Sequence, residues 1–176
     1  MRIVVLVVLL LGLCGCANIW RMDNGPLTAF SESVRKSPDP HYSMVWIDLQ
    51  KKTDARVLAA QIKLAEQAPL VAIGTLRPEF VARYLPAWEP PPQWPEIVKE
   101  KARQDDNYQG GGIYVSFRQG RLVYVSLVSE LRGERFYPQV AAPASTQPLT
   151  LPLSRAQMDE VFGPPRRVYR VSEVRY

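Results

Sequence analysis

Apolar and polar residues alternate most regularly over residues 112–129 (GIYVSFRQGRLVYVSLVS). In the first half of this stretch, Ile113, Val115 and Phe117 share one face of a predicted strand. The dipeptide Gln119-Gly120 then separates two β-rich runs, which predicts a hairpin with a two-residue turn. Because the second strand is apolar on both faces, we expect it to lie at the centre of a sheet.

Shorter patterns predict the other elements. β-Rich runs predict strands at residues 42–49, 70–74 and 168–174, and a further strand that includes Phe136 and Tyr137. Apolar residues at helical spacing, together with helix-starting residues, predict helices at residues 26–36, 53–68, 77–85, 95–103 and 154–162. The succession of strand, helix and strand over residues 42–74 is compatible with a right-handed parallel crossover.

The helix at residues 154–162 has signals at both ends. Ser154 is suited to cap its first turn, and Gln157 three residues later completes a capping box. Gly163 and the two prolines after it are typical of a helix stop. Residues 140–152, rich in Ala, Pro and Thr, predict a loop before this helix.

These elements indicate the α+β class, with a mostly antiparallel sheet built around the hairpin and helices packed on one face. We expect a single domain over residues 41–176. Residues 86–95 (PAWEPPPQWP) contain five prolines, so this stretch must be extended or irregular. It is either a connection along the surface or a linker between two halves of the domain.

The first residues have the layout of an export signal. Arg2 and the amino terminus supply positive charge, and residues 3–13 form an apolar run interrupted only by Gly12. The run is shorter than the roughly 20 apolar residues that cross a bilayer. A buried first strand or core helix is the alternative, but a core helix would show polar positions at helical spacing.

The run ends in Leu13-Cys14-Gly15-Cys16, which resembles the lipobox of bacterial lipoproteins. The resemblance implies that residues 1–15 are a lipoprotein signal peptide and that cleavage occurs before Cys16. It also implies a diacylglycerol on the Cys16 thiol and an acyl chain on the new amine. Anchors with two or more chains bind membranes firmly. Residues 16–40 would then be a tether.

The residue after the modified cysteine gives an expectation about location. In lipoproteins of enteric-type bacteria, an Asp at this position retains the protein in the inner membrane. Here the residue is Ala17, so the resemblance implies the periplasmic side of the outer membrane, with the inner membrane as the alternative.

Composition limits the partners of the mature chain. Cleavage leaves 161 of the 176 residues, enough for one domain with its own core. It removes one of the 22 basic residues, Arg2, and leaves 21 against 17 acidic ones, a balance that does not indicate nucleic-acid binding. A general attraction to lipid or lipopolysaccharide phosphate is compatible with this charge. Cys16 would be the sole cysteine, so we expect neither a disulfide framework nor a metal pair.

The candidate chemical groups are few. His41 is the only histidine, and nothing in the sequence places it in a catalytic triad or a zinc site. The segment Gly110-Gly111-Gly112 precedes a strand, so it predicts a hinge or bulge rather than an anion-binding loop. The acidic residues that could include a glycosidase pair are Asp48, Asp105, Asp106, Glu130 and Glu134. We expect them to be solvated or to cap helices, and we expect no catalytic residue, metal or cofactor.

Two features could bind a partner. Trp88 and Trp94 bracket the proline-rich stretch, where a stiff backbone would present large aromatic surfaces. The alternative is a loop held to the core by these tryptophans. Arg166, Arg167 and Arg170 load the last strand with positive charge, either as an anion-binding strip or as an edge strand kept soluble by charge.

The segment SRAQMDEVFGPPRRVYR, residues 154–170, is similar to part of the small outer-membrane lipoproteins that accompany the barrel-assembly machinery. Those proteins carry a short helix, a Gly-x-Pro stop and then a strand. In that family hairpin strands follow the motif, whereas here the best hairpin precedes it. The resemblance implies a role beside other envelope proteins.

The sequence therefore predicts a non-enzymatic lipoprotein, held on the membrane by acyl chains, that acts as an accessory or scaffold. Its expected partner is an envelope protein. Two alternatives remain: an inhibitor or immunity protein against an enzyme toxin in the periplasm, and a cell-wall hydrolase that uses acidic residues.

Overall fold

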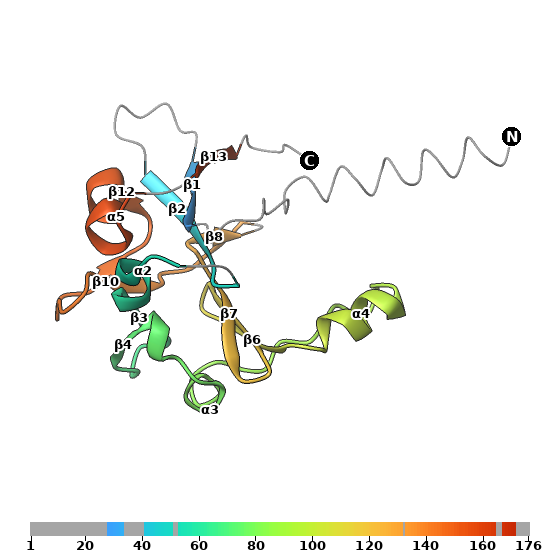
Figure 1. Ribbon diagram of the computed structural model, residues 1–176. Coiled ribbons are helices and arrows are strands. Elements are labelled where there is room, and N and C mark those ends of the chain that lie inside the picture. Colours follow the sequence, from blue (N-terminus) through green and yellow to red (C-terminus); the bar gives the residue numbers. More distant parts are fainter. Residues whose placement is uncertain (1–27, 34–40, 51–52, 132, 165–166, 172–176) are drawn as a thin grey trace, which may run out of the picture.

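The computed structural model describes residues 28–33, 41–50, 53–131, 133–164 and 167–171. Its main sheet has the strand order β13-β1-β2-β7-β6-β5, with β12 also paired to β2 (Figure 1). Of these strand pairs, only β1 with β13 is parallel, and the others are antiparallel. The strands are β1 (Thr28–Ser33), β2 (His41–Asp48), β5 (Asp106–Gly110), β6 (Ile113–Arg118), β7 (Arg121–Val128), β12 (Leu153–Ser154) and β13 (Arg167–Val171).

The predicted hairpin is confirmed. Gln119 and Gly120 connect β6 to β7 with φ angles of 53° and 74°, the left-handed pair that a tight hairpin turn requires. Strand β7 lies between β2 and β6, so its predicted central position is also confirmed. The core face of the hairpin includes Val115, Phe117 and Val125, which are fully buried.

The three consecutive glycines form a tight turn and not a hinge or bulge. Gly111 and Gly112 connect β5 to β6 with φ angles of 56° and 79°. A Cβ on Gly112 would lie 2.2 Å from the carbonyl oxygen of Val128 and 2.5 Å from the Cβ of Phe136. A glycine is therefore required at position 112, both because its φ angle is positive and because Val128 and Phe136 approach it closely.

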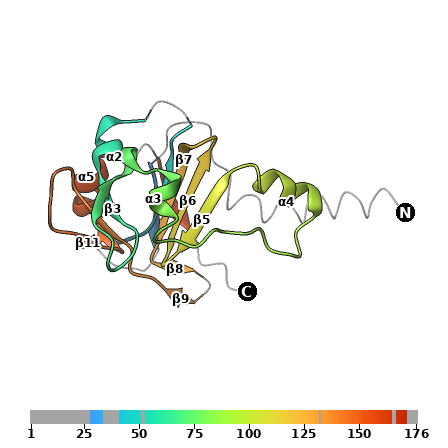
Figure 2. The same ribbon diagram turned by 90° about the horizontal axis from the view of Figure 1, so that it is seen from below.

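A second layer covers one face of the main sheet (Figure 2). It holds a small antiparallel sheet of order β11-β10-β3-β4. Its strands are β3 (Gln61–Lys63), β4 (Leu70–Ala72), β10 (Gln139–Ala141) and β11 (Leu149–Thr150). Helices α2 (Ala55–Ala59), α3 (Pro78–Val81) and α5 (Arg155–Phe162) lie in the same layer, with the 3-10 turn η2 (Ile73–Thr75). Strands β8 (Glu130–Leu131) and β9 (Glu134–Arg135) pair separately.

The core lies between these two layers. Ile62 of the small sheet, Val81 of α3 and Val161 of α5 are fully buried in one cluster with the hairpin residues. The α+β class and the mostly antiparallel sheet are thus confirmed, and α2, α3 and α5 lie on one face as expected. Helix α4 (Glu96–Ala102) is the exception, because it lies on the other side of the sheet. Among the described residues, no helix has the length and apolar character needed to cross a bilayer.

Helix α5 has the ends that its sequence predicts. The amide of Gln157 donates to Ser154 Oγ at 3.3 Å, and the amide of Ser154 donates to Gln157 Oε1 at 2.9 Å, so the capping box is present. Gly163 follows the helix with φ of 79°. The predicted helices starting at Pro78 and after Pro95 are confirmed as α3 and α4, although α3 ends at Val81.

The helix predicted at residues 53–68 is wrong beyond Ala59. Asp54 caps α2 by accepting from the amide of Arg56 at 2.8 Å, but Ala60 leaves the helix and Ile62 lies in β3 opposite Val140. In so short a stretch, the apolar positions fit both the helical and the strand period. Pairing with β10, about 80 residues later in the chain, decides in favour of the strand. The parallel crossover is also wrong, because β4 pairs antiparallel with β3 and β2 belongs to the other sheet.

Three further expectations need correction. The helix predicted at residues 26–36 is wrong for residues 28–33, which form β1, a strand of the main sheet within the segment expected to be a tether. Phe136 and Tyr137 lie between β9 and β10 and not in a strand. The loop predicted at residues 140–152 contains the end of β10 and all of β11. Two of these errors concern strands that form by pairing with other strands, β1 with β2 and β13, and β11 with β10.

Candidate binding site

Residues 87–105 form a projecting segment, which we call the arm. At its start, Ala87 pairs with Tyr108 of β5, and the amide of Trp88 donates to the carbonyl of Asn107 at 2.8 Å. The proline-rich stretch thus begins along the edge of the main sheet and then leaves it. The arm lies on the side of the sheet opposite α2, α3 and α5, and α4 lies in its outer part (Figure 2). It returns to the sheet at Asp105, just before β5.

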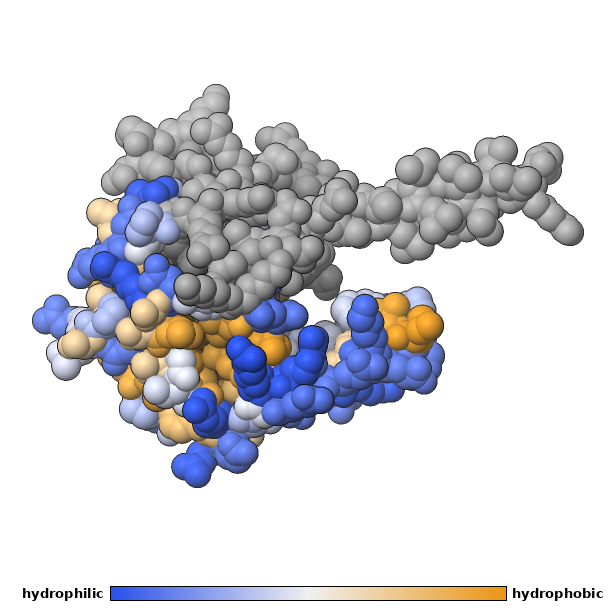
Figure 3. All heavy atoms as spheres, in the orientation of Figure 1, coloured by the Kyte–Doolittle hydropathy of each residue, from blue (hydrophilic) through white to orange (hydrophobic). Residues whose placement is uncertain are grey.

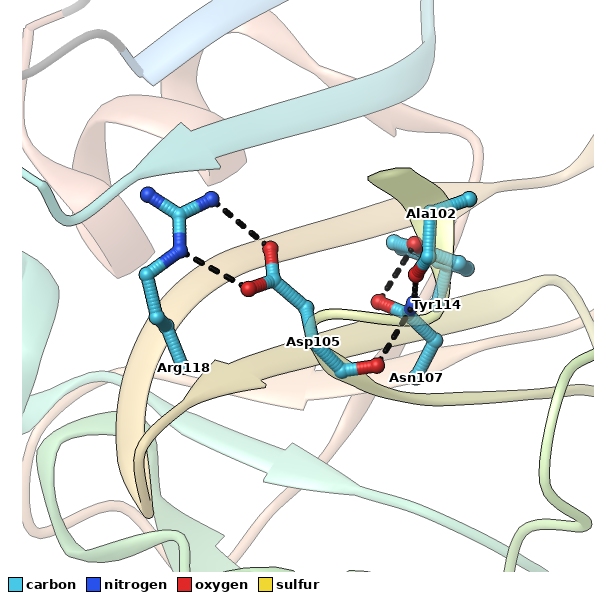
Figure 4. A network of polar contacts seen from close by, with 5 residues as sticks. All are labelled: Ala102, Asp105, Asn107, Tyr114 and Arg118. Atoms are coloured by element: carbon cyan, nitrogen blue, oxygen red, sulfur yellow. Dashed lines mark hydrogen bonds and ion pairs between the residues drawn. The ribbon is translucent and has the colours of Figure 1, made fainter. Parts of the chain in front are cut away.

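The base of the arm is fixed by a polar network (Figure 4). The side-chain amide of Asn107 donates to the carbonyls of Ala102 at 2.8 Å and Asp105 at 3.0 Å. Its Oδ1 accepts from the hydroxyl of Tyr114 on β6 at 2.8 Å. Asn107 is buried, and through these bonds it satisfies a carbonyl at the C-terminal end of α4.

An ion pair adds a second connection between the arm and the hairpin. Both carboxylate oxygens of Asp105 accept from Arg118, each at 2.8 Å, through Nε and Nη2. This bidentate geometry is the favoured one for arginine and carboxylate. The Asp105 carboxylate raises the pKa of the Arg118 guanidinium, mainly through these hydrogen bonds. The return of the arm into β5 is therefore held to the end of β6.

Aromatic rings support the start of the arm. Trp88 meets both Trp94 and Tyr114 edge to face, with ring centroids 5.9 Å apart in each pair. Tyr114 in turn lies 5.8 Å from Tyr124 of β7. Burial raises the pKa of both tyrosines, so their hydroxyls remain neutral at physiological pH. The two tryptophans singled out from the sequence are thus brought together, with Trp88 half-buried and Trp94 exposed.

The outer end of the arm exposes apolar side chains, which we call the tip: Trp94, Ile97 and Val98. Their exposed fractions are 39%, 77% and 42%. Figure 3 shows apolar surface at this end of the molecule. Of the residues of α4, all of which the structure describes, none is buried.

The charged side chains of α4 pair with one another. The Glu96 carboxylate lies 2.6 Å from Lys99 Nζ through Oε2 and 3.0 Å from Arg103 Nη1 through Oε1. Lys99 Nζ also donates to the carbonyl of Pro92 at 3.5 Å. The hydrogen bond from Lys99 is the largest cause that lowers the pKa of Glu96, and Arg103 adds to it. Glu96 is thereby paired with two basic side chains within the arm, beside the apolar tip.

A hollow of about 200 Å³ lies between the arm and β5. Its lining includes Trp88, Arg103, Asp105, Asp106 and Asn107. Three of its polar side chains already have partners: Asp105 binds Arg118, Arg103 binds Glu96, and Asn107 makes the three hydrogen bonds described above. We interpret the hollow as part of the attachment of the arm.

Among the acidic candidates, only Asp105 and Asp106 are brought to the same hollow. Asp48 is at the end of β2, with β7 and β6 between it and β5. Asp48 is buried and accepts from the amide of Gln50 at 2.9 Å, so the expectation that it is solvated or caps a helix is wrong. Glu130 and Glu134 are exposed on β8 and β9.

The other candidates from the sequence that the structure describes are not brought to the arm. His41 begins β2 opposite Ser154. Within the described ranges, no group of three or more His, Cys, Asp or Glu side chains could hold a metal ion. Cys16 and Arg166 lie outside the described residues. Arg167 and Arg170 lie on β13, at the edge of the main sheet, as expected of an edge strand.

Sequence reasoning missed the residues that fix and complete the arm. Ile97 and Val98 were missed because the sequence of their helix is mostly polar, with two Glu and two Lys in seven residues. A signal was present, since two adjacent apolar residues in an otherwise charged helix follow closely after Trp94. Asn107, Tyr114 and Arg118 gave no signal, because their partners are known only once β5 and β6 are paired.

Comparison with protein-family models, with curated proteins and with solved structures gives no match for this chain. The lipobox at Cys16 and the resemblance of residues 154–170 to barrel-assembly lipoproteins therefore stay predictions.

Proposed function

We propose that this protein is a lipid-anchored lipoprotein of the bacterial outer membrane that faces the periplasm. It binds another component of the envelope through the tip of its arm and catalyses no reaction. One observation carries the proposal: the arm is held firmly at its base yet presents Trp94, Ile97 and Val98 to the outside.

The fixed base makes the arm suited to binding. An ordered segment loses little conformational freedom when it meets a partner, so more of the contact energy appears as affinity. Adjacent large apolar side chains on a surface are typical of an interaction site. By contrast, both oxygens of Asp105 are occupied by Arg118, which does not favour the hydrolase alternative.

The size of the tip explains why an anchor matters. Complete burial of an isoleucine or valine side chain contributes about 1.5–3 kcal/mol. Ile97 and Val98 are only partly exposed in the free protein, so together they supply less than the roughly 3–6 kcal/mol of two complete burials, and association itself has a cost. The tip alone would therefore bind a partner only weakly. Such weak binding becomes effective when acyl chains on Cys16 keep the tip close to its partner, because tethering raises the local concentration.

The anchor is tested by labelling cells with a palmitate analogue. We expect the parent chain to incorporate the label and to sediment with outer membranes. The Cys16→Ala form should lose the label and change its fractionation. Equal labelling and fractionation of the two forms would contradict the anchor.

The binding is tested by photo-cross-linking in cells. A photoreactive phenylalanine analogue replaces Ile97 at the tip, and in a matched control it replaces Ala156, an exposed residue of α5. We expect adducts from position 97 at a much higher yield than from position 156. Absence of adducts from position 97, in a chain that remains anchored, would overturn the binding proposal.

A further inference from the structure

We propose that the component bound by the tip is the lipid bilayer itself. In this arrangement Trp94, Ile97 and Val98 enter the interface of the membrane that holds the acyl chains of Cys16. The inference rests on the proposed lipid anchor and names the partner of the same site. The domain would then contact its membrane at two places, the anchor and the arm.

Strand directions place the start of the domain and the arm at the same end of the main sheet. Strand β1 begins at Thr28, opposite Ile47 near the end of β2. Strand β2 ends opposite Tyr124, toward the turn between β6 and β7. The arm returns at Asp105, next to Arg118 at that same turn. The chain that leads from Cys16 therefore enters the sheet at the end where the arm is attached.

Chain length limits how far the membrane can be. Twelve Cα–Cα steps connect Cys16 to Thr28, and twelve extended residues span at most about 40 Å. Strands β1 and β5 are four strand spacings apart, or about 19 Å. An acylated Cys16 therefore keeps the base of the arm within roughly 60 Å of the bilayer.

The composition of the tip suits a lipid interface better than a water-exposed surface. Tryptophan is enriched at the level of lipid headgroups, where its ring is buried and its N–H remains hydrated. Ile97 extends furthest into solvent, with 77% of its surface exposed, and Val98 is next to it. Three such side chains are too few to hold a soluble protein on a membrane, so the contact depends on the anchor.

Charge does not oppose this contact. Within α4, Glu96 and Glu100 are balanced by Lys99 and Lys101, and Arg103 follows the helix. The arm close to the tip is thus near neutrality, so insertion needs no anionic lipid. We expect the contact to form on phosphatidylcholine vesicles and to depend little on salt.

The cysteine content of the mature chain allows a direct test. When Cys14 leaves with the signal peptide and Cys16 is acylated, an Ile97→Cys substitution introduces the only free thiol. A polarity-sensitive fluorophore is attached there, and in a matched control to Ala156→Cys on α5. The full-length acylated chain is reconstituted into phosphatidylcholine vesicles with and without lipids that carry nitroxide quenchers near the headgroup.

We expect a blue shift and strong quenching from position 97, and neither from position 156. Adding Val98→Asp, at a position that the fold does not bury, should abolish both signals at position 97 while the chain remains on the vesicles. Unshifted, unquenched emission from position 97 on an anchored chain would overturn the bilayer as partner. Cross-linking in cells from position 97 gives a second check. If it yielded adducts with a protein and none with lipid, the bilayer would be overturned as the partner, whereas the proposal that the tip binds an envelope component would survive. Failure of the acylated chain to stay on vesicles would instead overturn the lipid anchor, and with it this inference.

Discussion

Helices α4 and α5 are nearly equal in length, yet they are held in place by opposite means. Helix α5 buries Met158, Val161 and Phe162 and has a capping box at its start. Helix α4 buries nothing, and its N-cap residue, Pro95, makes no side-chain cap. Instead, β5 and the two tryptophans hold the arm that carries α4. The comparison teaches that α5 is a structural element, whereas α4 is positioned to display its side chains.

The largest expected difference between the two helices is the cost of removing an apolar side chain. Met158→Ala should lower the free energy of unfolding by about 2–5 kcal/mol, because it leaves a cavity in the core. Ile97→Ala should change it by less than about 0.5 kcal/mol, because Ile97 is exposed. Urea denaturation of both variants measures this. A large loss of stability in Ile97→Ala would show that the tip packs in the core.

The base of the arm should be the next most sensitive place. Asn107→Ala removes three hydrogen bonds and leaves the Tyr114 hydroxyl and the Ala102 carbonyl without these partners. We expect a loss of about 1–3 kcal/mol. Hydrogen exchange should accelerate in residues 88–104 more than in α5. Equal acceleration in both helices would contradict a base that holds the arm specifically.

The capping difference predicts a smaller effect. Ser154→Ala should cost about 1 kcal/mol through loss of the N-cap of α5. Pro95→Ala at the equivalent position of α4 removes no side-chain cap and should change stability little. Thermal unfolding of the two variants compares them. If Pro95→Ala were the more destabilising change, the ends of α4 would contribute more than this account allows.

The smallest expected effect is the dependence of stability on acidic pH through Glu96 of α4. The pKa of Glu96 lies below its ordinary value of 4.5, first because Lys99 hydrogen-bonds the carboxylate. Because the pKa is lower in the folded state, the ionised Glu96 carboxylate stabilises the fold fully above pH 4.5. This stabilisation is lost as the pH falls through the folded-state pKa. In an NMR titration, Lys99→Ala should move the Glu96 pKa back toward 4.5. An unchanged pKa would show that Lys99 does not hold this carboxylate.

The parts of the fold that could be predicted from the sequence are those with local signals. The turn at Gln119-Gly120, the capping box at Ser154 and the stop at Gly163 each act within a few residues, and all three are present. The strand at residues 61–63 could not be separated from the preceding helix. Its evidence lies in β10, far along the chain.

The candidate site was predictable only in part, for the same reason. Prolines and tryptophans pointed to residues 86–95 as a stiff aromatic segment, and the structure brings Trp88 and Trp94 together. Sequence could not reveal that this segment is the first half of an arm completed by α4. That required the bonds from Asn107 and Arg118, which depend on how β5 and β6 pair.

Photo-cross-linking in cells from α4 and α5 tests the central claim most directly. The account predicts adducts from position 97 on α4 and few or none from position 156 on α5, both in chains anchored through Cys16. Equal yields from the two helices, or none from position 97, would contradict the claim that the arm is the binding element of this protein.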